Sequence, residues 1–179
     1  MRSRIRTFLR ASEGALSVEA VLIGPVLLWL IAATTVFWDA YKTKTVADRS
    51  AYTLADMISR EAEIDADYLD ALYEIYEFLS YTPDDKSFRV SVVGAFENGA
   101  AAPRVKLVWS EGVGGMEKRN GIGPLKQRLP EMVAGEQLIV VEALQTWTPP
   151  FSIGIGTLNF GEIAVVRPRF APTLAWVDD

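Results

Sequence analysis

The side chains that most often carry out catalysis are missing from this chain. Its 179 residues include no histidine and no cysteine. These absences exclude Ser-His-Asp and Cys-His catalysis, disulfide frameworks and the usual zinc sites. Paired carboxylates remain as a route to glycoside hydrolysis. We nevertheless expect a protein that is not an enzyme and that needs no cofactor or metal.

The most informative side chain is Glu19, which stands at the start of an apolar run. Residues 20–38 contain 19 residues and no charge. As a helix they would span about 28 Å, close to the hydrocarbon thickness of a bilayer. A carboxylate costs roughly 2.5–3.5 kcal/mol at the bilayer centre. A simple membrane anchor does not need this carboxylate. A segment that later leaves the lipid and packs against copies of itself could use it in that packing.

Charge is distributed unevenly around the apolar run. Residues 1–14 carry four arginines and one glutamate, a net charge of +3, which leaves −8 for residues 15–179. The positive-inside rule therefore keeps the N-terminus in the cytoplasm and exports everything after Trp38. Phe37, Trp38 and Tyr41 stand where an interfacial aromatic belt would lie. An acidic exported part argues against nucleic acid as a partner, because that would require a basic patch.

Two plainer interpretations of the N-terminus stay open. An uncleaved signal anchor would explain the apolar run and the arginines equally well. The second interpretation is a cleaved secretory signal, for which Ala32-Ala33 is a weak possible cleavage site. The apolar region of such a signal is normally about 7–15 residues, however, and this run is longer.

The helical period continues after the apolar run. No Gly or Pro occurs between Asp39 and Tyr81, so we predict one long helix from Val18 to Arg60, with a kink at Gly24-Pro25. Small and apolar residues line one face of it: Ala40, Ala47, Ala51, Leu54 and Ile58. This stripe either covers the protein's own sheet or lets another helix approach closely, and the two interpretations are compatible.

A second helix is predicted to end before the turn at residues 82–85. Leu69, Leu72, Tyr76 and Leu79 recur at helical spacing, and Asp65 or Asp67 is available as an N-cap. The carboxylates between residues 61 and 77 lack the Asp-x-Asp-x-Asp-Gly pattern of a calcium loop. We interpret them as a solvated helix face.

The apolar period changes to two at Lys86, which predicts strands. We expect a hairpin of residues 86–96 and 104–110, and further strands at residues 137–147 and 162–170. A short helix is predicted over Pro124 to Val133, and a loop over Thr148 to Asn159. Strands joined by loops favour antiparallel pairing. The expected fold class is α+β: a long N-terminal helix packed on a small antiparallel sheet of about four strands, with a second helix.

Glu142 and three tryptophans are the other side chains that attract attention in the sheet region. Glu142 lies within an apolar strand, and we expect it to pair across strands with Arg167 or Arg169. Trp109, Trp147 and Trp176 could mark a partner surface, but core packing is the expected role of each.

The N-terminal block resembles that of type IV prepilin-like proteins. These have a short basic leader, a glycine before the cleavage site and a glutamate at the fifth mature position, which here would be Gly14 and Glu19, with Ala15 as the new N-terminus. The chain is similar in particular to the TadE-like minor pilins, or pseudopilins, of the tight-adherence (Flp) pilus system. The block from Gly14 to Ala20 with Pro25 is the specific part of the resemblance; residues 137–149 and the Arg167-Pro168-Arg169 ending are shorter matches. Flp major pilins are much shorter and have Tyr where this chain has Ala20.

The resemblance implies a set of partners and a cellular place. A prepilin peptidase would cut between Gly14 and Ala15. Glu19 would then pair with the free amine of Ala15 in a neighbouring subunit, because a buried charge is tolerable mainly when it is paired. The other implied partners are pilin or pseudopilin subunits, the pilus assembly platform and the lipid bilayer. The implied location is the bacterial inner membrane, crossed once, with a periplasmic C-terminal part.

These expectations divide the chain into four segments. They are a leader (1–14), a transmembrane segment (15–38), a periplasmic helical region (39–81) and a periplasmic sheet domain (82–179). The expected function is that of a minor pilin or pseudopilin in pilus assembly. The alternatives are an uncleaved membrane-anchored periplasmic binding domain and a pseudopilin of a type II secretion system.

Overall fold

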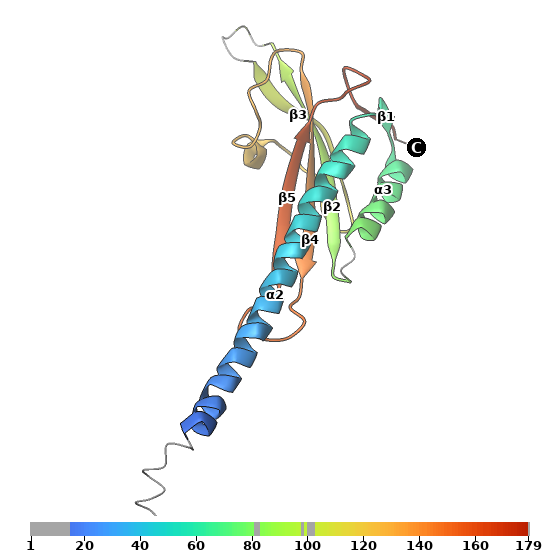
Figure 1. Ribbon diagram of the computed structural model, residues 1–179. Coiled ribbons are helices and arrows are strands. Elements are labelled where there is room, and N and C mark those ends of the chain that lie inside the picture. Colours follow the sequence, from blue (N-terminus) through green and yellow to red (C-terminus); the bar gives the residue numbers. More distant parts are fainter. Residues whose placement is uncertain (1–14, 81–82, 98, 100–102, 179) are drawn as a thin grey trace, which may run out of the picture. The chain divides into compact units, whose positions relative to one another are not determined.

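The protein has an α+β fold in which two helices accompany one main sheet (Figure 1). The computed structural model describes residues 15–80, 83–97, 99 and 103–178, and only the backbone of residues 15–17. Within this part the long helix, the second helix and the four-stranded antiparallel sheet are all present. The predicted fold class is therefore confirmed. The leader, with Gly14, lies outside the described residues.

The chain groups into two compact units, which we describe separately. The described residues of the first are 15–40 together with the loop Pro149–Gly156. The second consists of Tyr41–Thr148 and Thr157–Asp179 and contains the sheet. Helix α2 (Ala15–Ile58) supplies residues to both units.

Helix α2 is one continuous element of 44 residues that includes Pro25. It ends at Ile58, two residues before the predicted end at Arg60. The amide of Arg60 donates to the carbonyl of Met57, a tighter turn that is common where a helix stops. The chain then enters strand β1 (Glu63–Ile64).

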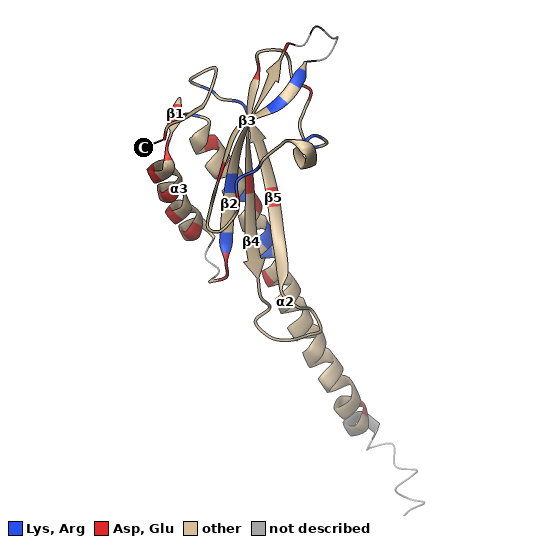
Figure 2. Cartoon of the chain, turned by 180° about the vertical axis from the view of Figure 1, so that it is seen from behind, with Lys and Arg blue, Asp and Glu red and all other residues tan. Residues whose placement is uncertain are grey.

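Helix α3 (Ala66–Leu79) begins at the N-cap Asp65, one of the two predicted caps. The Asp65 carboxylate accepts a hydrogen bond from the amide of Tyr68 at 2.8 Å, which satisfies one of the free donors of the first turn. The helix buries the predicted apolar face, with Leu69, Leu72 and Tyr76. Its outer face is acidic, as Figure 2 shows in red, and the carboxylates on it are exposed.

The sheet has the strand order β3-β2-β4-β5, all antiparallel. Its strands are β2 (Lys86–Phe96), β3 (Arg104–Val113), β4 (Gln137–Trp147) and β5 (Leu158–Val166). The predicted hairpin is confirmed as the β2–β3 pair, with a register shift between Val92 and Val93. Strand β5 begins and ends four residues earlier than predicted. Its end precedes Pro168, which has no amide to donate, and the Arg169 amide donates instead to the Ser59 carbonyl at the end of α2.

Two local features differ from the sequence-based expectation. The short helix predicted over Pro124 to Val133 is only a 3-10 turn, η2 (Gly123–Leu125), followed by hydrogen-bonded turns to Leu129. Pro130 offers no amide, so the turns do not continue through it. The parallel pair of β1 with β6 (Ala175–Trp176) was not anticipated; it ties the chain's end to the segment between α2 and α3.

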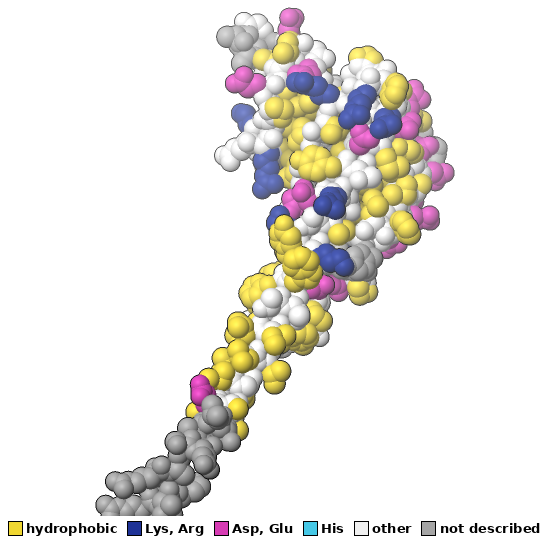
Figure 3. Space-filling model, viewed as in Figure 1, with side chains coloured by type: hydrophobic (Ala, Val, Ile, Leu, Met, Phe, Trp, Pro, Cys, Tyr) yellow, Lys and Arg dark blue, Asp and Glu magenta, His cyan; other side chains and the backbone are white. Residues whose placement is uncertain are grey.

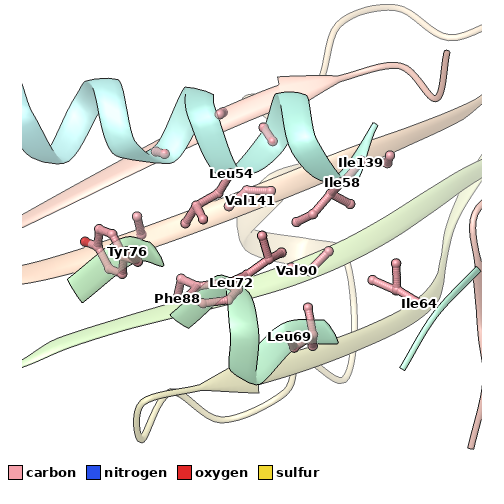
Figure 4. Packing of buried hydrophobic residues seen from close by; sticks show 14 of the residues in the cluster. Leu54, Ile58, Ile64, Leu69, Leu72, Tyr76, Phe88, Val90, Ile139 and Val141 are labelled. Atoms are coloured by element: carbon pink, nitrogen blue, oxygen red, sulfur yellow. The ribbon is translucent and has the colours of Figure 1, made fainter. Parts of the chain in front are cut away.

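The two faces of the sheet have separate apolar cores within the second unit. On one face, the last turns of α2 and helix α3 pack on β2 and β4, as the close-up shows for Leu54, Leu72 and Val141 (Figure 4). On the other face, Leu125 and Met132 from the segment around η2 cover Leu138 and Val140. Of the predicted helix stripe, Ala51, Leu54 and Ile58 thus pack on the protein's own sheet.

Candidate functional site

Most of the apolar helix surface in the first compact unit is exposed within the described part of the chain, whereas Ala33 and Val36 are buried. Figure 3 shows this surface in yellow. Val21 is 72 % exposed and Leu28 is 69 % exposed, although both would be buried in an ordinary soluble fold. The other large apolar side chains exposed along this part of α2 are Val18, Leu22, Ile23, Val26, Leu27, Trp29, Leu30, Ile31, Phe37 and Trp38. A continuous apolar surface of this extent requires a covering of lipid or protein.

This segment meets the requirement for spanning a bilayer. Among the described residues, α2 is the one helix that is long and apolar enough to cross a membrane. The expectation of an N-terminal membrane-compatible helix is confirmed at this level. Pro25 does not end the helix, and a Cβ added at the neighbouring Gly24 would meet no atom within 4 Å. Membrane helices tolerate a proline where neighbouring groups re-satisfy the backbone.

Glu19 is the only charged residue of the described helix before Asp39. Its side chain is exposed, and within the described part of the chain it has no ion-pair or hydrogen-bond partner. Ala15, the other expected assembly residue, begins the same helix one turn earlier. A carboxylate on such an apolar helix surface would be costly in lipid unless a cation neutralised it.

The second unit contains a buried charge cluster that has a different composition from the one expected. Glu142 on β4 lies directly opposite Arg89 on β2, and the guanidinium Nη2 of Arg89 is 2.8 Å from Glu142 Oε2. Arg119, from the loop after β3, donates to both carboxylate oxygens of Glu142, at 3.2 and 2.6 Å. The three side chains are only 12–16 % exposed. The cluster therefore joins β2, β4 and a long loop.

The prediction that Glu142 pairs with Arg167 or Arg169 is wrong. Both arginines follow the last residue of β5, whereas the β5 residue opposite Glu142 is Ile163. Arg167 pairs with Glu136, and Arg169 pairs with Asp56 of α2 at 2.8 Å. Register decides the partner, because cross-strand pairs form only between residues that lie opposite or diagonal to each other.

A cavity of about 330 Å³ adjoins this cluster on the face of the sheet away from α3. Arg89, Arg119 and Glu142 line it together with Arg128, Met116 and Leu144. It has the size of a small-ligand site. Among the described residues, however, no group of three or more carboxylates, histidines or cysteines could hold a metal ion.

Two surface ion pairs secure the edges of the second unit. Lys44 Nζ lies 2.8 Å from Glu162 Oε1, and this hydrogen bond and charge raise the pKa of Lys44. The Glu136 carboxylate accepts the amide of Val133 and pairs with Arg167, and these two contacts lower the pKa of Glu136. Exposed pairs of this kind contribute little stability each.

The tryptophans behave as core residues rather than as a partner surface. Trp147 is buried. The Trp109 indole donates to the Leu174 carbonyl at 2.9 Å, and its ring packs on that of Trp176 with 5.5 Å between the ring centroids. Sequence reasoning missed Arg89 and Arg119, the partners of Glu142. A buried carboxylate in an apolar strand was the signal that a cation must be near it.

No family model, no curated protein and no solved structure matches this chain.

Proposed function

We propose that this protein is a non-enzymatic, single-pass pilus-assembly subunit of the minor pilin or pseudopilin type. The observation that carries the proposal is the exposed apolar surface of α2 from Val18 to Trp38, with a single carboxylate at its start. Such a surface can lie in lipid before assembly and against the helices of other subunits afterwards. The resemblance of residues 14–20 to TadE-like prepilins supports the same function.

In this proposal the leader is removed by a prepilin peptidase between Gly14 and Ala15. Glu19 then neutralises the new amine of Ala15 on a neighbouring subunit, which removes two uncompensated charges from a low-dielectric environment. The N-terminus faces the cytoplasm, and the second compact unit lies in the periplasm of a bacterium, outside the inner membrane. Other pilin subunits and the assembly platform are the proposed partners.

The first experiment is an intact mass and N-terminal sequence of the protein from native membranes, in wild type and in a prepilin-peptidase deletion. We expect a start at Ala15 that disappears in the deletion. A chain that begins at Met1 in both strains would contradict processing. It would favour the alternative of an uncleaved anchored binding domain, for which the cavity beside Glu142 is the specific structural support.

The second experiment tests assembly with a matched pair of variants. Glu19→Ala should be processed and inserted but should not enter sheared pili, because the neighbouring amine would stay uncompensated. Glu131→Ala removes an exposed carboxylate of the second unit and should assemble normally. Normal pilus output from the Glu19→Ala strain would contradict the proposed role of Glu19 in assembly. Neighbouring genes for a Flp pilin and a tight-adherence ATPase, rather than for a secretin and general-secretion components, would distinguish this system from type II secretion.

A further inference from the structure

The loop between β4 and β5 lies in a long stretch without charge. Residues 143–161 include no Asp, Glu, Lys or Arg, although 23 % of the whole chain is charged. Figure 2 shows this loop entirely in tan. Its central part, Pro149–Gly156, alternates apolar and small residues, with Phe151, Ile153 and Ile155 as the large ones. A loop in contact with bulk water is usually richer in polar side chains, so this composition indicates another environment.

The same segment belongs to the first compact unit, with the apolar part of α2. Pro149–Gly156 is grouped with the described helix residues 15–40. Both ribbon views show the loop beside α2 (Figures 1 and 2). Ala33 and Val36 are 5 % and 0 % exposed, whereas the helix side chains from Val26 to Ile31 face outward. The loop therefore covers α2 near the C-terminal end of its apolar run.

This position corresponds to a defined depth if α2 spans a membrane. Val36 precedes Asp39, the first charge after Glu19, by three residues, or about 4.5 Å along a helix. Phe37, Trp38 and Tyr41 are exposed around the same level, as expected for an interfacial aromatic belt. The loop thus lies at the level of the boundary between hydrocarbon and headgroups.

The chemistry of the loop fits that boundary and no deeper layer. Phe151 is exposed and can enter the acyl boundary, and the loop backbone is irregular, with a turn at Gly154 where φ is 97°. Irregular backbone facing lipid does not occur in the hydrocarbon core, because its amides and carbonyls would be unsatisfied. Headgroups and interfacial water supply hydrogen-bond partners.

We propose that the loop Pro149–Gly156 lies in the headgroup layer of the bilayer on the exported side, as a second membrane contact beside α2. The placement rests on the membrane-spanning part of the proposed function. Its occupant is the lipid interface of the same bilayer, and no second protein is required. The contact would limit how far α2 can slide along the membrane normal before assembly.

The test uses single cysteine substitutions. Because the chain has no cysteine of its own, a thiol-reactive label attaches only at the introduced position. Phe151→Cys and Ser152→Cys report on the loop, Leu27→Cys on the spanning helix and Val133→Cys on an exposed site of the second unit. Each full-length variant carries an environment-sensitive fluorophore in phosphatidylethanolamine–phosphatidylglycerol vesicles. Quenching is measured with aqueous iodide, with lipids labelled near the headgroup and with lipids labelled deep in the acyl chain.

We expect the loop probes to be quenched by the shallow lipid label. Iodide quenching of these probes should be about threefold weaker than at Val133, because interfacial segments sit roughly 5–10 Å into the headgroup–acyl boundary. The Leu27 probe should respond to the deep label. Loop probes that iodide quenches as strongly as Val133, or that neither quencher reaches, would overturn the placement while leaving the spanning helix intact. Failure of the deep label to quench the Leu27 probe would contradict the spanning of α2 and the loop placement together.

Discussion

Arg119 Nη2 lies 2.6 Å from Glu142 Oε1, although the two residues belong to a loop and a strand that are 23 positions apart in the sequence. Arg89 donates to the other oxygen of the same carboxylate from the adjacent strand. One carboxylate thus compensates two guanidinium groups that are largely withdrawn from water. This cluster anchors the long loop after β3 to the sheet.

Glu142→Gln should destabilise the protein by about 2–4 kcal/mol, because it leaves two poorly solvated guanidinium groups without a counter-charge. Glu162→Gln is the matched control on the next strand. The partner of Glu162 is Lys44, whose side chain is 55 % exposed, so Glu162→Gln should lower the stability by less than about 1 kcal/mol. The measurement is chemical denaturation of the detergent-solubilised full chain, with tryptophan fluorescence as the readout of unfolding. Equal losses of unfolding free energy for the two variants would show that the buried cluster contributes no more to stability than the exposed ion pair.

Leu54→Ala should cost about 2–5 kcal/mol, because it opens a cavity between α2 and the sheet. Leu54 is fully buried beside Val141 and Leu72 (Figure 4). Thr53→Ala alters the adjacent, exposed position of the same helix and should change stability by no more than about 0.5 kcal/mol. The same denaturation experiment compares them. A Leu54→Ala variant as stable as Thr53→Ala would mean that α2 does not pack on the sheet in solution.

Gly114→Ala should be more damaging than Gly115→Ala, although both glycines have positive φ, 71° and 89°. Each substitution carries a backbone penalty of roughly 1–2 kcal/mol. A Cβ at Gly114 would also lie 2.5 Å from the Tyr73 ring and 2.6 Å from the Lys86 carbonyl oxygen, whereas at Gly115 it meets nothing within 4 Å. Thermal unfolding of the two variants measures the difference. Equal melting temperatures would contradict the close approach of this turn to α3 and β2.

Tyr76→Phe should make the protein more resistant to alkaline unfolding. Burial raises the pKa of Tyr76 above the value of about 10 in an unfolded chain. The stabilisation from its neutral form is therefore complete below pH 10 and is lost as the pH rises above that value. At neutral pH the variant loses only the hydrogen bond to the Leu144 carbonyl, about 0.5–1.5 kcal/mol.

The check is a pH titration of the melting temperature between pH 7 and pH 11.5. The wild type should fall more steeply above pH 10 than Tyr76→Phe does. Tyr52→Phe changes an exposed tyrosine and should follow the wild-type curve. Parallel curves for all three proteins would mean that the ionisation of Tyr76 does not limit alkaline stability.

The local patterns were sufficient for most secondary structure. The period of two predicted β2 and β3, and the strand-like run around Ile139–Val141 predicted β4. The period of 3.6 with an aspartate before it predicted α3 and its cap at Asp65. These features depend on neighbours within a few positions, which a single sequence displays. The start of β5 was missed because Leu158–Phe160 follow a Gly-rich stretch and are strand residues only through pairing with β4.

The sequence by itself determined the fold class, the apolar helix and the isolated position of Glu19, because periodicity, length and charge can all be counted along the chain. Tertiary structure decided which residues meet. Strand register, rather than composition, paired Glu142 with Arg89. The path of the chain after β5 placed Arg169 beside Asp56 of α2. Tertiary structure also brought the uncharged loop Pro149–Gly156 into one unit with the helix that precedes it by more than a hundred residues. Contacts between distant segments depend on the path of the whole backbone, and no local pattern contains that path.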